Sequence, residues 1–86
     1  MTLEGDFAAL LTELARTTAP LDRIDDWFDA HEREAFGFGA ASYELRTCVQ
    51  DALAVCWRVR RSYLGEAAAR SRLGALAGLL AGAPSE

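Results

Sequence analysis

Apolar residues recur at the spacing of an α-helix in four successive segments of the chain. The first segment, residues 3–16, begins after Thr2, whose hydroxyl is suited to cap a helix N-terminus. Its stripe follows the order i, i+4, i+7, i+8 and i+11 and consists of Leu3, Phe7, Leu10, Leu11 and Leu14. This pattern predicts a helix from about Leu3 to Arg16.

The second segment, residues 20–35, opens with Pro20, which is favoured in the first turn of a helix. One side of this segment is apolar and carries Leu21, Ile24, Phe28 and Ala35. We expect Gly37 to end the helix in the left-handed conformation, with Phe36 and Phe38 folding back onto the core.

The third segment, residues 42–63, is the longest, and Ser42 is its expected N-cap. Its stripe consists of Leu45, Cys48, Val49, Ala52, Leu53, Cys56, Val59 and Tyr63. The fourth segment, residues 66–81, follows Gly65 and ends before Gly82 and Pro84. Its stripe consists of Ala69, Leu73, Leu76, Ala77 and Leu80.

These patterns predict an all-α protein with a single helical domain over residues 1–86, folded as an antiparallel four-helix bundle. A three-helix core with a loosely docked fourth helix is the alternative. A chain of 86 residues buries only about 60–65% of its unfolded surface, so its core is modest. Such a core leaves little room for a buried active site.

The second segment is also strongly acidic on the side opposite its apolar residues. Its aspartates repeat at i, i+3, i+4 and i+7, a spacing at which each like-charged pair costs an isolated helix about 0.2–0.5 kcal/mol. We therefore consider them a candidate partner-binding face, with Trp27 as an aromatic anchor; the carboxylates are Asp22, Asp25, Asp26 and Asp29. A solvated face that keeps the domain dissolved is the competing interpretation.

Basic residues gather elsewhere in the chain. All nine are arginine, and five lie between Arg58 and Arg72 with one acid among them. We expect this group to pair within the chain or to sit at helix ends, although it could also bind phosphate or an acidic partner. The net charge of −4 argues against a nucleic-acid-binding protein.

Few residues offer catalytic or metal chemistry. His31 is the only histidine, and the His31–Glu34 pair supplies too few ligands for a metal site. Cys48 and Cys56 lie about 12 Å apart if both are on one helix, too far for a disulfide, so we expect buried free thiols. No motif for a nucleotide or cofactor occurs. We therefore expect no enzyme, no cofactor and no metal.

We expect a cytoplasmic protein without a signal peptide or membrane span, since Glu4 and Asp6 stand where a signal peptide would be basic. The fourth segment is apolar on more than one side, where Leu76, Leu79 and Leu80 surround Gly74 and Gly78, two glycines that would allow another helix to approach closely. We expect it either to be deeply buried in the monomer or to pack against a second copy, and a small core gains from the second. This feature favours a homodimer through that segment.

The acidic stretch from Ile24 to Glu32, with the amphipathic first segment and the long third one, resembles the small helical immunity proteins of the colicin D immunity type. The resemblance spans about Phe7 to Leu80. It implies an inhibitor whose Asp22, Asp25, Asp26 and Asp29 meet the basic groove of a bacterial, tRNA-cleaving toxin. The alternative function is a helical adaptor or effector-associated domain in a signalling or defence assembly.

Overall fold

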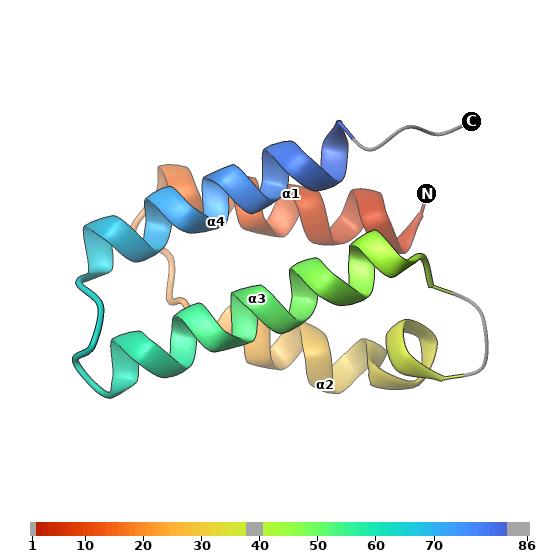
Figure 1. The fold of residues 1–86 in the computed structure, drawn as a ribbon, viewed down its shortest axis with the longest axis horizontal. Helices are drawn as coiled ribbons and strands as arrows, with labels where there is room; N and C mark the ends of the chain where they lie inside the picture. Colours follow the sequence, from red (N-terminus) through yellow and green to blue (C-terminus); the bar gives the residue numbers. More distant parts are fainter. Residues whose placement is uncertain (1, 38–40, 83–86) are drawn as a thin grey trace.

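A computed structural model describes residues 2–37 and 41–82, and it contains four helices. Each helix runs opposite to the preceding one, so the chain forms an antiparallel four-helix bundle (Figure 1). The helices are α1 (Leu3–Arg16), α2 (Arg23–Phe36), α3 (Tyr43–Arg60) and α4 (Glu66–Ala81). The predicted all-α fold is confirmed.

The closest packing in the bundle joins α1 to α4, which lie far apart in the sequence. At their crossing Gly74 faces Ala15, and a Cβ atom added to Gly74 would lie 3.2 Å from the Cβ atom of Ala15. Arg70 adds a polar clamp, because its guanidinium donates to the carbonyl oxygens of Leu14 at 2.7 Å and Ala19 at 2.9 Å. The carbonyl of Leu14 belongs to the last turn of α1, where such groups lack a partner within the helix.

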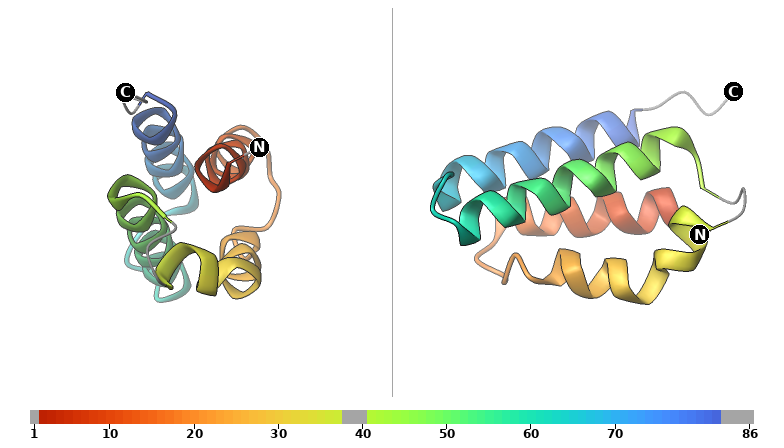
Figure 2. Two further views of the ribbon diagram at one scale, coloured as in Figure 1. Left: turned by 90° about the vertical axis from the view of Figure 1, so that its right-hand side faces the viewer. Right: turned by 60° about the horizontal axis from the view of Figure 1, so that its bottom comes forward.

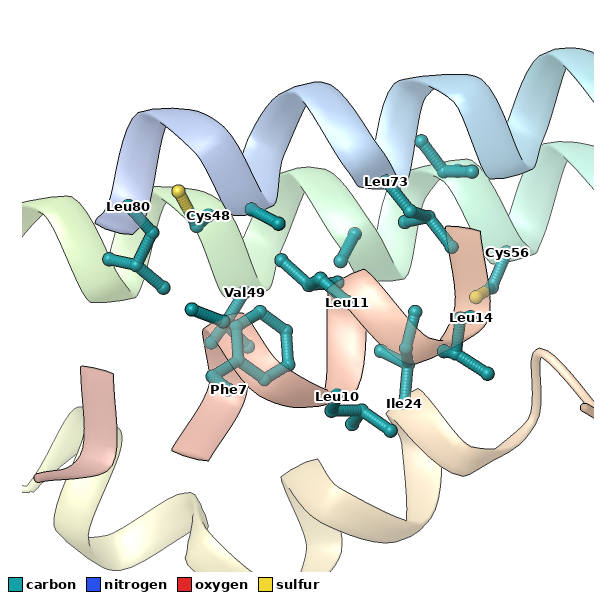
Figure 3. Close-up of a cluster of buried hydrophobic side chains, with 14 of the residues drawn as sticks. Phe7, Leu10, Leu11, Leu14, Ile24, Cys48, Val49, Cys56, Leu73 and Leu80 are labelled. Atoms are coloured by element: carbon teal, nitrogen blue, oxygen red, sulfur yellow. The ribbon is translucent and has the colours of Figure 1, made fainter. Parts of the chain in front are cut away.

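The core lies between all four helices and is made of aliphatic, aromatic and thiol side chains (Figure 3). Phe7, Leu11 and Leu14 of α1 are fully buried at its centre, facing Val49 of α3 and Leu73 of α4. The expected stripes of α1 and α4 are confirmed, apart from Leu3 and Leu76, which are only partly buried. In α3 the expected stripe fails at its end, where Tyr63 lies beyond the helix and is 69% exposed.

Helix α2 has the smallest share of the core. Ile24 and Ala35 are its only buried residues, while Trp27, Phe28 and Phe36 are half-buried at the edge. Helix α4, in contrast, packs extensively against α1 and α3. The alternative fold with a loosely docked fourth helix is wrong for this reason.

Both ends of α2 differ from the prediction. The helix begins at Arg23 rather than Pro20, because the amide groups of Arg23 and Ile24 bond back across only three residues in a preceding turn. Gly37 is extended rather than left-handed, with φ −80° and ψ −164°. Glycine is needed there for space, since a Cβ would collide with the carbonyl oxygen of Arg33. Phe38 lies outside the described residues.

The predicted caps of α1 and α3 are confirmed. Thr2 accepts from the amide of Gly5 at 2.9 Å, and Ser42 accepts from that of Leu45 at 3.1 Å. Helix α3 ends at Arg60, three residues earlier than predicted, because Ser62 adopts φ +62°.

The amide groups after this end bond back in the pattern of a Schellman motif. Tyr63 donates to the carbonyl of Arg58, and Ser62 donates to that of Val59. Glycine usually occupies the left-handed position of this motif, so the sequence offered no obvious stop signal before Gly65.

The α1–α4 crossing predicts unequal effects of substitution at the two glycines of α4. Gly74→Val should overpack the contact with Ala15 and cost about 1–3 kcal/mol of the free energy of unfolding. Gly78→Val should change it by less than about 0.5 kcal/mol, since nothing lies within 4 Å of a Cβ there. Urea unfolding of the two variants compares their free energies of unfolding. The change in intrinsic helix propensity is the same in both, because each replaces a glycine by valine in α4. Equal losses would show that α1 and α4 do not approach closely.

Candidate functional site

The structure divides the four candidate aspartates between two sides of α2. Asp25 faces α3, where its carboxylate oxygen Oδ2 lies 2.9 Å from Nη1 of Arg60. Asp22 precedes α2 and lies 3.9 Å from the same guanidinium nitrogen. Part of the acidic face is thus neutralised within the chain, by an arginine of the group that was expected to pair internally.

Asp26 points toward the opposite side, into an open hollow between α1 and α2. We call this hollow the α1–α2 groove; its volume is about 500 Å³. The residues that line it are Asp6, Ala9, Leu10, Glu13, Arg23, Asp26, Trp27 and His31. Asp29 is exposed on α2 and does not line the groove.

Aromatic rings form part of the groove wall. The ring of Trp27 lies 4.6 Å from that of Phe7 and stacks on the imidazole of His31 at 4.3 Å between centroids. His31 also lies with its Nδ1 2.9 Å from the carbonyl oxygen of Trp27. The expected anchor Trp27 is half-buried between the rings of Phe7 and His31, and part of it lines the groove.

One ion pair crosses the groove between its helices. The guanidinium of Arg23 donates to Oε2 of Glu13 at 2.7 Å. This hydrogen bond, with the attraction between the charges, lowers the pKa of Glu13 and raises that of Arg23. Within the described part of the chain, Asp6 and Asp26 make no ion pair. The groove thus has two unpaired carboxylates, one on each wall.

Asp6 and Glu13 are site residues that the sequence analysis did not select. They lie seven positions apart in α1, so they share one face of that helix. The seven-residue spacing could have predicted that Asp6 and Glu13 share a face. Which helix this face meets depends on the antiparallel register that sets it opposite Arg23 and Asp26, and one sequence does not provide that register.

The arginine group is largely used within the chain, as predicted for it. Arg60 binds Asp25, Arg70 binds Glu66 and the end of α1, and Arg61 lies 4.9 Å above the ring of Trp57. Arg58 and Arg72 are exposed and line a different hollow, between α3 and α4.

Both cysteines are free and buried, as predicted. The thiol of Cys56 donates to the carbonyl oxygen of Leu21 at 3.5 Å, and burial with the nearby Asp25 raises its pKa to about 11. Burial also raises the pKa of Cys48. A thiol acts as a nucleophile only when ionised, so neither one is activated.

The part of the chain that the structure describes contains no cluster of three or more metal-binding side chains. None of the helices described is long and apolar enough to cross a membrane. No family model, curated protein or solved structure matches this chain.

The division of the acidic face predicts unequal effects of charge reversal. Asp25→Lys would place a cation beside Arg60 and should cost about 1 kcal/mol of the free energy of unfolding at low salt. Asp26→Lys, in the same first turn of α2, should cost less than half of that because it faces only carboxylates and the more distant Arg23. Urea unfolding at low and high salt measures both. Equal losses, or a difference that salt does not reduce, would contradict the assignment.

The raised thiol pKa predicts slow modification in the folded state. At pH 8, Cys56 with a pKa of about 11 holds about a hundredfold less thiolate than at the ordinary value of 9.0. Its reaction with a disulfide reagent should accelerate at least as much on unfolding in urea. The variants Cys48→Ala and Cys56→Ala each leave one thiol. Cys48 should react faster because it lines a further open hollow between α3 and α4, next to Tyr43 and Leu79. Rapid reaction of folded Cys56 would contradict its burial.

Proposed function

We propose that this chain is a non-enzymatic protein-binding module, most concretely an immunity-like or antitoxin-like inhibitor of a basic, nucleic-acid-directed bacterial toxin. The observation that carries the proposal is the α1–α2 groove. Its walls hold three carboxylates and one guanidinium, and that guanidinium is already paired with Glu13. The groove therefore offers negative charge to a partner.

The groove has the chemistry that recognises an arginine or lysine side chain. The unpaired carboxylates of Asp6 and Asp26 can accept charge-assisted hydrogen bonds from a guanidinium. The stacked rings of Trp27 and His31 offer an aromatic surface beside them. Asp29, exposed on α2, extends the negative field and would speed the approach of a basic protein, and Asp22 just before α2 adds to it as far as Arg60, 3.9 Å away, leaves its charge unpaired.

A toxin that cleaves RNA presents a basic groove to its substrate. An acidic surface that occupies this groove blocks it by mimicking phosphate charge. The proposal therefore rests on electrostatic complementarity. We place the protein in the cytoplasm, where such a toxin meets its RNA and where two free thiols stay reduced.

The placement of His31 supports a non-enzymatic role. One of its ring nitrogens faces the carbonyl oxygen of Trp27, and its ring is covered on one side by the indole. Neither thiol lines the groove, since Cys56 is buried in the core and Cys48 borders a hollow on the α3 and α4 side of the bundle. The groove therefore pairs no nucleophile with this base.

The adaptor alternative needs a free basic end that could bind the acidic end of another copy. Arg60 and Arg70 are engaged within the chain, and Arg60 is bound to the acidic helix itself. Arg58 and Arg72 make no ion pair among the described residues, but they share their hollow with Asp51, so this side of the bundle is not a purely basic end. We therefore favour the inhibitor over the head-to-tail adaptor. A homodimer through α4, the other partner that the sequence predicts, would use the opposite side of the bundle.

The test measures binding of a hexa-arginine peptide by tryptophan fluorescence. The variant Trp57→Phe serves as the parent, because it leaves Trp27 as the only tryptophan. Asp6→Asn with Asp26→Asn should weaken binding at least about tenfold, since both charge-assisted contacts lose their charge. Glu32→Gln with Glu34→Gln makes the same change in net charge on an exposed part of α2 and should weaken it less than about threefold.

If the two double variants weaken peptide binding equally, the peptide responds only to the net negative charge of the protein and not to the groove. That result would overturn the proposal. The neighbouring reading frame in the genome provides the functional comparison. If it encodes a basic nuclease, the parent should stop its cleavage of tRNA, and the Asp6/Asp26 variant should not. If the parent leaves cleavage unchanged, the inhibitor proposal is wrong.

A further inference from the structure

A second groove runs along the side of the bundle formed by α3 and α4. It consists of two hollows, of about 420 Å³ and about 300 Å³, that meet at Asp51 and Leu76. We call it the α3–α4 groove. Figure 2 shows α3 and α4 on one side of the bundle and α1 and α2 on the other, so the two grooves face away from each other.

The charges of the α3–α4 groove are separated along its length. Glu44 and Asp51 line the first hollow, and Arg58 and Arg72 line the second. None of these four makes an ion pair with any other described residue. Glu44, Asp51 and Arg58 follow at intervals of seven residues, so they lie in one row along α3. Asp51 stands midway between the other two.

The shape of the groove also differs between its ends. At the acidic end, Tyr43 and Leu79 project as large apolar side chains that are 72% and 69% exposed. In the other half of the groove, the positions one turn from the arginines, toward Asp51 and Leu76, are occupied by the small residues Ala54 and Ala75. Large apolar side chains thus stand in one half of the groove, and small ones lie beside the arginines in the other.

We propose that the α3–α4 groove is the interface of a homodimer, in which a second copy packs antiparallel across a two-fold axis near Asp51 and Leu76. Such an axis exchanges the two ends of the groove. It places Glu44 of each copy opposite Arg58 of the other, about 10 Å from the axis for a helix rise of 1.5 Å per residue. It also brings Leu79, three residues from Leu76, over the half of the groove where Ala54 and Ala75 lie within three residues of the axis. Tyr43, eight residues from Asp51, lies beyond Arg58 of the other copy.

Self-complementarity selects a second copy over a foreign partner. A surface that joins to itself by a two-fold axis must carry complementary features at equal distances on either side of it. Glu44 and Arg58 satisfy that condition here, with Asp51 at the midpoint, and Leu79 meets the small residues of the other half. The proposal does not depend on the function of the α1–α2 groove, which stays open in this dimer.

The structure changes the basis on which a dimer was expected. Gly74 and Leu80 were expected to serve the dimer, yet Gly74 packs against Ala15 and Leu80 is buried in the core. Leu76 is partly buried at the floor of the groove. Only Gly78 and Leu79 of that set are exposed on α4. Helix α4 alone therefore exposes too few apolar residues for a dimer interface, and the charged row of α3 adds the complementary charges.

Charge exchange tests the proposed orientation. Glu44→Arg and Arg58→Glu should each weaken the dimer at least about tenfold, because the two-fold axis repeats each repulsion twice. The double variant restores opposite charges and should return to within about threefold of the parent. Sedimentation equilibrium from micromolar to millimolar protein measures the dissociation constants. Thermal unfolding followed by circular dichroism checks that each variant folds.

Three further measurements use the same assay. An equal mixture of the two single variants should form heterodimers, since each reversed charge then meets its opposite. Leu79→Gln should weaken the dimer without lowering monomer stability, because its side chain is mostly exposed; it tests the interface even if a charge variant fails to fold. Asp51→Asn should tighten the dimer, because near the axis the two Asp51 carboxylates face and repel each other.

A parent that stays monomeric at millimolar concentration overturns the proposal. A double variant that dimerises as weakly as the two single variants also overturns it. That result would show that Glu44 of one copy does not face Arg58 of the other. Weaker association on Asp51→Asn would show that this carboxylate faces a cation, and would exclude the two-fold axis at its position.

Discussion

The close approach of α1 and α4 is the contact on which the rest of the bundle depends. A glycine at position 74 lets the backbones come together at Ala15, and Arg70 ties the last turn of α1 and the following loop to α4. The guanidinium satisfies two carbonyl oxygens that would otherwise face a partly buried environment. Once α1 is fixed in this way, its buried residues define the core, and the row from Asp6 to Glu13 is turned toward α2.

Helix α2 is held differently, by contacts at its edges. Ile24 enters the core, while the ion pairs Asp25–Arg60 and Glu13–Arg23 connect α2 to its neighbours on either side. Exposed ion pairs contribute only about 0–1 kcal/mol each, so their main effect is to set the orientation of the helix. That orientation explains why the aspartates have unequal roles: those that face α3 support the fold, and those that face α1 or solvent remain free to meet a partner.

The sequence predicts the helices well because their stripes are long and regular. The bounds of α1 and α4 agree with it, as do the caps at Thr2 and Ser42. It misses the end of α3, since Ser62 takes a conformation usually reserved for glycine, and it misreads Gly37, which is required for space. The site is harder to predict. Spacing along α2 showed four clustered carboxylates, whereas the structure shows that their neighbours on α1 and α3 divide them.

The two grooves obey different physical requirements, and this lets one small domain carry both. The α1–α2 groove bears one dominant sign of charge, so it repels its own copy and attracts a basic protein. The α3–α4 groove carries both signs in separate halves with exposed apolar side chains, so it is suited to itself. A dimer formed there would extend a modest core and leave two acidic grooves facing outward. Its net charge would double from the −4 of one chain, strengthening the field that guides a cationic partner to either groove.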